Sequence, residues 1–530
     1  MIGDSRSGRD ERRVRSECHA RFAWDQVSFD SAPGRWLLAV AVLGSGIAFL
    51  DATVVNVALP DIGRDLHAST STLQWILNGY TLTLASLILL GGSLGDRYGR
   101  RRIFVSGTGL FTIASLLCAV APNAALLVAA RLVQGVGGAL LTPGSLAMVE
   151  SGFRPADRAR AIGAWSGLGA VAGALGPLVG GLLVGAVSWR AVFLINLPLG
   201  IFIVVMAGRH VPETHDPAAG GRIDFRGAIL AAVGLGLTTY ALIEAPGHGS
   251  SLLVPVTAIG GGLALIAFVL AERRSPNPMM PLSIFASRQF SAANAVTFVV
   301  FGALSGVFFL LVSFLQISLG YSPLAAGAAS LPITVLMLLF SPAAGALAQR
   351  IGPRIPLTVG PLVTAFGLLL MSRIGPGDSY LSGVLPAVIV FGAGLTLVVA
   401  PVTATVMAAA DERHSGIASG INTAVSRLSG LIIVAVLPLV AGLTGEKFYD
   451  PAAMDHGFHV AMLVCAGLAA AGGVLAWFTI SSEVLESEPA PGGDLPTGVL
   501  HDFSCAVGGA PLRPGREADC RPIAADPAAG

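Results

Sequence analysis

The sequence is poor in charged residues. Only 12% of its 530 residues are charged, whereas soluble domains carry about 25%. So few charges cannot cover a water-facing surface of this size, which excludes the soluble, fibrous and disordered classes. Lysine occurs once, at Lys447, and Glu446 precedes it, so the phosphate-cradling pattern GxxxxGK[ST] is absent. We therefore expect no nucleotide cofactor on this chain.

Cysteine is also scarce and carries no recognisable pattern. The five cysteines form no CxxC pair and have no metal-ligand spacing, so we expect neither a disulfide framework nor a metal site. They are Cys18, Cys118, Cys465, Cys505 and Cys520. The first apolar run begins near Trp36, behind a tail rich in Arg and acidic residues that does not fit the short basic region of a signal peptide, so a cleavable signal peptide is not expected.

What the chain has instead is long apolar segments. Hydrophobic residues make up 54% of it, and mean hydropathy is +0.75. The runs are close to the roughly 20 residues that cross a bilayer as a helix. They predict an all-α integral membrane protein with fourteen spans near 36–58, 73–95, 103–121, 124–150, 160–187, 190–207, 225–245, 252–271, 291–316, 327–348, 355–373, 381–409, 417–442 and 458–481.

An internal repeat organises these spans. The loop GSLGDRYGRR at 92–101 has a counterpart, GALAQRIGPR, at 345–354. The repeat predicts two pseudo-symmetric six-helix bundles that rock around a site near the bilayer midplane. The expected divisions are an N-terminal tail 1–35, a first bundle 36–207, an inserted helix pair 225–271, a second bundle 291–481, and a disordered tail 482–530 rich in Pro, Gly and Ala.

The basic residues predict the orientation. Apart from the tails and two arginines inside spans, sixteen basic residues fall on one side and four on the other, and these four are Arg64, Arg190, Arg373 and Lys447. Cytoplasmic loops carry the excess of Lys and Arg. We therefore expect both termini in the cytosol.

Deep ionisable groups identify the candidate proton-coupling site. Asp51 is the one acidic residue placed well inside a predicted span, and Arg131 lies at a matching depth in the fourth span. Each costs about 2.5–3.5 kcal/mol on insertion scales, so an ion pair or a shared polar cavity is expected. Burial disfavours an ionised carboxylate while a neighbouring guanidinium favours it, and a near balance would permit proton exchange. The alternative is a fixed pair that only orients helices.

Three further polar residues are candidates for the substrate cavity: Asn56, Gln134 and Arg427. Gln134 is one helical turn from Arg131 and can hydrogen-bond to either charge or to the substrate. Arg427 is the second deep charge, and no acid of the second half is placed to meet it. A carbonyl cluster or an anionic substrate group would satisfy it, and snorkelling or a water-filled cleft is an equal alternative.

Two glycine-containing segments suggest conformational roles. In the loop at 92–101 we expect a latch formed by Gly92, Asp96, Arg97, Gly99 and Arg101, although the arginines alone could serve only to set orientation. The fifth span contains Gly163, Gly176, Pro177, Gly180 and Gly181. Proline kinks a helix and small residues permit close helix contact.

These motifs resemble the major facilitator superfamily, in particular its fourteen-span drug:proton antiporter branch (EmrB/QacA type). GSLGDRYGRR is similar to motif A. RLVQGVGGA, with Arg131 and Gln134, is similar to motif B, whose arginine is implicated in proton transfer. LDATVVNVALP resembles the first-helix motif that carries an acid at Asp51, and G-x8-G-x3-GP-x2-GG is matched from Gly163 except at Ala172, where the family favours Gly. SWRAVFLINLPLG and GIASGINTAVSRLSG also resemble stretches of this branch.

The resemblance implies a proton-coupled exporter of amphipathic small molecules, chiefly drugs or antibiotics, in a bacterial inner membrane. Its partners would be protons, the substrate and the lipid bilayer, without nucleic acid, and we expect a monomer. The alternative is a dedicated exporter of one endogenous product, such as a self-made antibiotic, a siderophore or a lipid. A membrane enzyme or receptor is a remote third reading, because an enzyme would cluster His, Asp or Glu at one membrane face and the nine histidines are scattered.

Overall fold

The computed structural model describes residues 26–215, 223–245, 252–276, 278–410 and 415–485. The described chain forms one helical unit, and its β-structure is limited to an isolated bridge between Val27 and Phe153. Fourteen of its helical segments are long and apolar enough to span a membrane, which confirms the predicted fold class. The helices are α2 (Ala32–Asp65), α3 (Thr70–Tyr98), α4 (Arg100–Ala119), α5 (Ala124–Gly152), α6 (Pro155–Ala186), α7 (Ala191–Leu194), α8 (Asn196–His210), α9 (Phe225–Glu244), α10 (Leu253–Arg274), α11 (Arg288–Ile317), α12 (Pro323–Ala329), α13 (Leu331–Ile351), α14 (Arg354–Met371), α15 (Leu385–Ala408), α16 (Ser415–Val440) and α17 (Pro451–Thr479).

Local sequence explains where several helices begin. Ser31, Ser69, Asn123 and Ser287 accept hydrogen bonds from backbone N–H groups in the first turns of α2, α3, α5 and α11. Such caps satisfy donors that a helix N-terminus otherwise leaves unpaired. Most of the apolar side chains on α10 remain exposed, among them Ile259, Leu263 and Ile266. An apolar surface of this kind suits contact with lipid rather than water.

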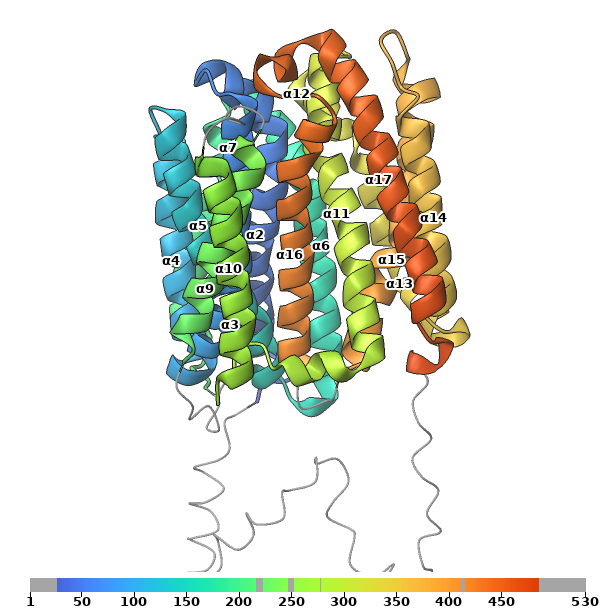
Figure 1. The fold of residues 1–530 in the computed structure, drawn as a ribbon. Helices are drawn as coiled ribbons and strands as arrows, with labels where there is room; N and C mark the ends of the chain where they lie inside the picture. Colours follow the sequence, from blue (N-terminus) through green and yellow to red (C-terminus); the bar gives the residue numbers. More distant parts are fainter. Residues whose placement is uncertain (1–25, 216–222, 246–251, 277, 411–414, 486–530) are drawn as a thin grey trace, which may run out of the picture. The chain divides into compact units, whose positions relative to one another are not determined.

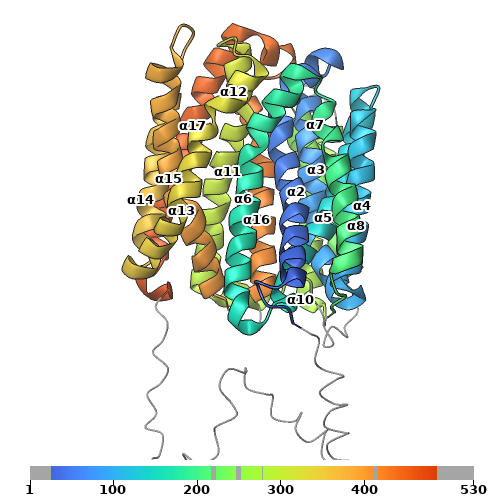
Figure 2. The same cartoon turned by 180° about the vertical axis from the view of Figure 1, so that it is seen from behind.

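The helices form two halves and an inserted pair. In Figure 1 most of the first half (α2–α5 and α7) lies on the left and most of the second half (α11, α13–α15 and α17) on the right, while α6 and α16 run near the centre; Figure 2 shows the same arrangement from behind. The inserted helices α9 and α10 pack against each other, and α9 also contacts α3 and α16. Trp75 of α3 donates its indole N–H to Glu244 Oε1 at the end of α9 (3.3 Å). The inserted pair therefore attaches beside one seam between the halves.

The end of the unit that holds Asp65 and Pro451, called the far end here, is closed by contacts between the halves. Side chains of α3 donate to carbonyls of α16: Gln74 Nε2 to Val434 O (2.7 Å) and Asn78 Nδ2 to Leu431 O (3.2 Å). Pro438 lacks the N–H that would otherwise bind Val434 O, so Gln74 satisfies a carbonyl that the proline leaves open. On another pair of helices, Gln316 Nε2 of α11 donates to Val57 O of α2 (3.0 Å).

A loop tyrosine adds a further contact at the far end. Tyr449 donates its hydroxyl to Ala68 O (2.7 Å), and Thr70 Oγ1 donates to Gly445 O (2.7 Å). Burial raises the pKa of Tyr449 to about 12, so the phenol keeps its proton and remains a donor at neutral pH. Together these bonds hold the halves together at the far end in the described conformation.

The opposite end, called the terminus end here because α2 begins and α17 ends there, shows the internal repeat directly. Gly99 joins α3 to α4 with φ of 112°, and Gly352 joins α13 to α14 with φ of 80°. Both values lie in the region that favours glycine. The two glycines occupy equivalent positions of the repeated loop, so the two halves share a turn as well as a sequence motif.

The structure differs from the predicted divisions in some details. The N-terminal tail was expected to reach residue 35, but α2 begins at Ala32, and Val27 N bonds to Gly152 O (2.9 Å) while Phe29 N bonds to Asp157 Oδ2 (3.0 Å). The sixth span is divided between α7 and α8, and the tenth between α12 and α13. Of the C-terminal tail predicted at 482–530, only 482–485 lies within the described residues, where it forms a short 3-10 helix.

Candidate functional site

Asp51 lies inside the first half and is completely buried. Its Oδ2 atom accepts a hydrogen bond from Arg131 Nη1 (2.5 Å). Its Oδ1 atom accepts from Gln134 Nε2 (2.8 Å) and from Asn196 Nδ2 (3.0 Å). Three donors from two other helices therefore surround one carboxylate, an arrangement that stabilises its ionised form.

Arg131 is also buried, with 1% of its surface exposed. Besides Asp51, it donates from Nε to Ile76 O (3.1 Å) and from Nη1 to Gln134 Oε1 (2.7 Å). Its guanidinium stands 4.5 Å from the ring centroid of Tyr80. A buried charge needs a partner and hydrogen bonds to offset its desolvation, and Arg131 has both. The expected ion pair between Asp51 and Arg131 is present.

Two residues of this cluster were missed by the sequence analysis. Asn196 donates from Nδ2 to Ser115 Oγ (3.0 Å) as well as to Asp51, and Ser115 donates in turn to Phe193 O (2.9 Å). The Oδ1 atom of Asn196 is buried and has no hydrogen-bond partner among the described residues. An amide in the middle of an apolar run, two residues before Pro198, was the available signal.

The local sequence positions Asn196. Pro198 lacks the N–H that would bind Leu194 O, and its ring crowds that turn, so the helix is interrupted between α7 and α8. The interruption falls at Ile195, and Asn196 is the first residue of α8. The proline therefore accounts for the break that places this amide against Asp51.

The cluster has the chemistry of a buried proton site. Asp51 is the group that can gain or lose a proton, Arg131 is its permanent counter-charge, and the two amides can donate to the carboxylate or accept from a carboxylic acid. Gln134 was predicted to line the substrate cavity. The structure places it here instead, fully buried with both ends of its amide bonded to Asp51 and Arg131.

The two other predicted cavity residues lie outside the cluster. Asn56 is partly exposed, and its Nδ2 donates to Ala52 O on its own helix (3.3 Å). Arg427 is near the middle of α16 in the second half and is partly exposed. It makes no hydrogen bond or ion pair with any residue that the structure describes.

The glycine–proline segment of α6 packs against both halves. Pro177 cannot bind Gly173 O, and Thr53 Oγ1 of α2 donates to that carbonyl (3.0 Å). A Cβ atom at Gly176 would lie within 2 Å of Thr53 Oγ1, and one at Gly181 would lie 2.5 Å from Pro323 O of α12. Gly163, by contrast, has open space around it.

The close approach at Gly181 gives a direct test. We expect Gly181→Val to destabilise the described conformation by about 1–3 kcal/mol, because the added side chain overpacks the backbone of α12. Gly185→Val, one turn further along the same helix where nothing lies within 4 Å, is the matched control. Thermal melting of the two purified variants checks this, and equal melting temperatures would contradict it.

The predicted latch is only partly assembled as expected. Asp96 pairs with Arg100 (2.8 Å), whereas Arg101 is held by Glu213, which accepts from its backbone N–H (3.0 Å). Glu213 was missed because it is 112 residues away in the sequence. The other members lie close by: a Cβ at Gly99 would meet Glu213, Gly92 faces Pro143, and Arg97 stands over the ring of Tyr98.

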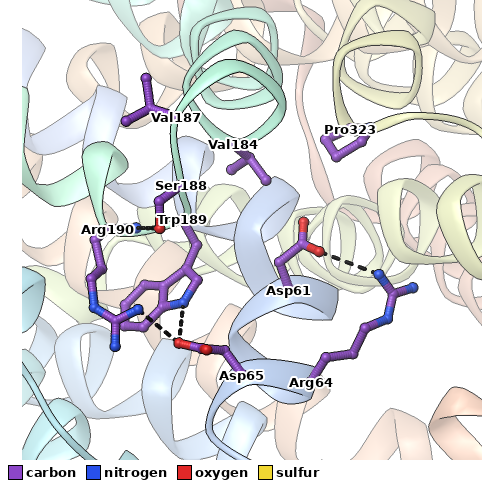
Figure 3. Close-up of a pocket in the computed structure, with 9 residues that line it drawn as sticks. All are labelled: Asp61, Arg64, Asp65, Val184, Val187, Ser188, Trp189, Arg190 and Pro323. Atoms are coloured by element: carbon purple, nitrogen blue, oxygen red, sulfur yellow. Dashed lines mark hydrogen bonds and ion pairs between the residues drawn. The ribbon is translucent and has the colours of Figure 1, made fainter.

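A pocket of about 500 Å³ opens at the far end. Figure 3 shows its lining, in which Asp61 pairs with Arg64, and Asp65 accepts from Trp189 and Arg190 (2.9 and 2.7 Å). Val184, Val187, Ser188 and Pro323 complete it. Asp61 is ten residues from Asp51, roughly 15 Å along α2. This pocket is therefore separate from the buried cluster and lies where α6 meets α12.

Comparisons with known proteins agree with this architecture. The model of the Major Facilitator Superfamily matches residues 41–434. The chain belongs to the Major Facilitator Superfamily. It is 38% identical to "Multidrug resistance protein Stp" of Mycobacterium tuberculosis (strain CDC 1551 / Oshkosh), over 76% of this chain and 75% of the relative.

Other members of the superfamily are similar as well. A "Probable actinorhodin transporter" of Streptomyces coelicolor is 38% identical over 80% of this chain and 75% of its own length. Among solved structures, a POT family transporter superposes with a TM-score of 0.61 at 14% sequence identity, covering 82% of this chain and 94% of that one. The chain is thus a multi-pass membrane transporter rather than an enzyme.

Proposed function

We propose that this transporter exports amphipathic small molecules, drugs or antibiotics among them, in exchange for protons. The observation that carries the proposal is the buried set of Asp51, Arg131, Gln134 and Asn196, which surrounds one titratable carboxylate with a permanent cation and two amides. Relatives named for multidrug, methylenomycin A and puromycin resistance support the substrate class.

The proposed cycle uses the two halves. Substrate enters from the cytosol or inner leaflet while the terminus end is open and Asp51 is ionised. The halves then rock, the far-end contacts of Gln74, Asn78 and Gln316 break, and substrate leaves. A proton that reaches Asp51 resets the carrier. One proton moving through about 150 mV supplies about 3.5 kcal/mol, enough for a gradient of several hundredfold.

The remaining expectations complete the proposal. The protein lies in the inner membrane of a bacterial cell with both termini in the cytosol, where the arginines after α3 meet the positive-inside rule. It is driven by the proton gradient without a nucleotide or metal cofactor. It acts as a monomer in contact with the lipid bilayer, with protons and a small molecule as its ligands.

A dedicated exporter of one endogenous product is the second candidate. It is favoured by relatives named "Probable actinorhodin transporter" and "Tetracenomycin C resistance and export protein". The two candidates differ in breadth, because a multidrug exporter lowers the accumulation of several unrelated compounds and a dedicated one lowers that of a single product. A panel of unrelated dyes and antibiotics separates them.

The test of proton-driven export compares cells that make the protein with cells that lack it. We expect dye accumulation to fall several-fold in the cells that make it, and the difference to disappear when an uncoupler collapses the proton gradient. Cells that make the Gly185→Val variant provide a folded comparison. A difference that persists in the presence of the uncoupler would contradict proton coupling.

A further inference from the structure

The interface between α3 and α16 contains a positive charge that the protein itself does not neutralise. Arg427 lies between two contact points on this seam: Leu431 O accepts from Asn78 on one side, and Gly420 lies against Leu89 on the other. Residues 420, 427 and 431 follow one another at helical spacing, so Arg427 belongs to the stripe of α16 that faces α3. It is therefore not placed to snorkel toward lipid.

The possible protein partners of Arg427 are used elsewhere. Asp51, the deep acid of the first half, is paired with Arg131, and its second oxygen is taken by two amides. Two described acids of the first half at the terminus end, Asp96 and Glu150, lie close to the ends of their helices. Neither an acid nor a carbonyl binds Arg427 in the part of the chain that the structure describes.

A second unpartnered polar group lies in the core of the first half rather than at the seam. Tyr80 of α3 is 2% exposed, and its hydroxyl has no hydrogen-bond partner among the described residues. Arg131 covers its ring at 4.5 Å, and a Cβ atom at Gly138 of α5 would lie 3.3 Å from the hydroxyl oxygen. This hydroxyl therefore does not reach the seam, and Arg427 is left as the group there that can bind a ligand.

We propose that Arg427 binds an acidic group of the substrate, so that the transporter prefers amphipathic anions over neutral and cationic molecules of the same size. This rests on the export function proposed above. A guanidinium binds a carboxylate or phenolate through charge-assisted hydrogen bonds, whereas it repels a cation. Because Arg427 belongs to the stripe of α16 that faces α3, a bound anion would lie between the halves and be released when they separate.

The test measures binding to the purified full-length protein, without any gradient. The probes are 1-pyrenebutyrate, 1-pyrenebutanol and 1-pyrenebutylamine, which share one aromatic group and differ in charge, and energy transfer from the six tryptophans reports binding. We expect pyrenebutyrate to bind about 10- to 100-fold more tightly than pyrenebutanol. Pyrenebutylamine should bind most weakly. Equal binding of the amine and the acid, or no binding of the acid, would overturn the proposal.

Variants assign the preference to Arg427. Arg427→Gln should remove the preference for pyrenebutyrate and leave pyrenebutanol binding unchanged, which also shows that the variant is folded. Arg427→Lys keeps a charge without the bidentate geometry and should retain part of the preference. Arg373→Gln removes an exposed charge from the same half and is the matched control. A preference that survives Arg427→Gln would overturn the assignment, whereas binding without proton-driven export would overturn only the export function.

Discussion

Replacing Asp51 by Asn is expected to reduce proton-driven export to the level of membranes that lack the protein. The substitution keeps the shape of the side chain but removes the group that can change charge in the buried cluster. Export is measured in inverted membrane vesicles as dye uptake driven by an imposed pH gradient. Binding of pyrenebutyrate should remain, because Asp51 contacts Arg131, Gln134 and Asn196 rather than the seam at Arg427.

The new amide fits the shape of the cluster but leaves Arg131 buried without its counter-charge, so the melting temperature and membrane level of the variant are measured together with export. The new amide brings two N–H donors. The buried Oδ1 atom of Asn196 has no hydrogen-bond partner among the described residues, so it can accept a bond from one of these donors. Asp65→Asn is the matched control: it makes the same chemical change on the same helix, at a half-exposed carboxylate paired with Arg190. Undiminished pH-driven export by Asp51→Asn would remove Asp51 from the mechanism.

The sequence located Asp51, Arg131 and Gln134 of the cluster but not Asn196 and Ser115. Asp51 and Arg131 stand out because an ionised group deep in a membrane is costly and therefore demands a partner. Asn196 and Ser115 cost less to bury and occur in many helices, so position along the chain alone does not distinguish them. Tyr80 was not predicted for the same reason, because tyrosine is common in apolar segments.

Fold prediction succeeded for span number and failed at the interruptions. Hydropathy counts residues that fit a bilayer, and all fourteen spans are present. Hydropathy is not sensitive to backbone interruptions, so it did not predict that a proline such as Pro198 divides the sixth span into α7 and α8. The pairing of Arg101 with Glu213 was not predicted for a different reason. It joins the first turn of α4 to the segment after α8, and only the folded bundle brings these together.

Helix α2 links the proton site to the seam between the halves. Asp51 faces the cluster, while Thr53, two residues later, donates to Gly173 O in the glycine–proline segment of α6. That segment reaches the second half, where Gly327 lies against Pro177 O and Gly181 against Pro323 O. A change of charge at Asp51 therefore acts on α2, which contacts α6. Helix α6 in turn contacts α12, the element of the second half at the far end.

Arg131→Gln is expected to lower stability strongly. It leaves the Asp51 carboxylate buried without its counter-charge, and breaking a buried pair in this way costs about 3–5 kcal/mol. Thermal melting and yield of the purified protein measure the loss. Arg373→Gln, which removes an exposed arginine, should change neither.

The double variant Asp51→Asn/Arg131→Gln separates the ion pair from the other contacts of Arg131. If the unpaired carboxylate is the cause of the loss, neutralising it should recover much of the stability without recovering export, since no titratable group remains in the cluster. If the double variant melts as low as Arg131→Gln alone, the loss belongs instead to the bond with Ile76 O and the contact with the Tyr80 ring. The first result would show that Arg131 serves mainly to keep a carboxylate ionised inside the bundle, the condition that proton exchange at Asp51 requires.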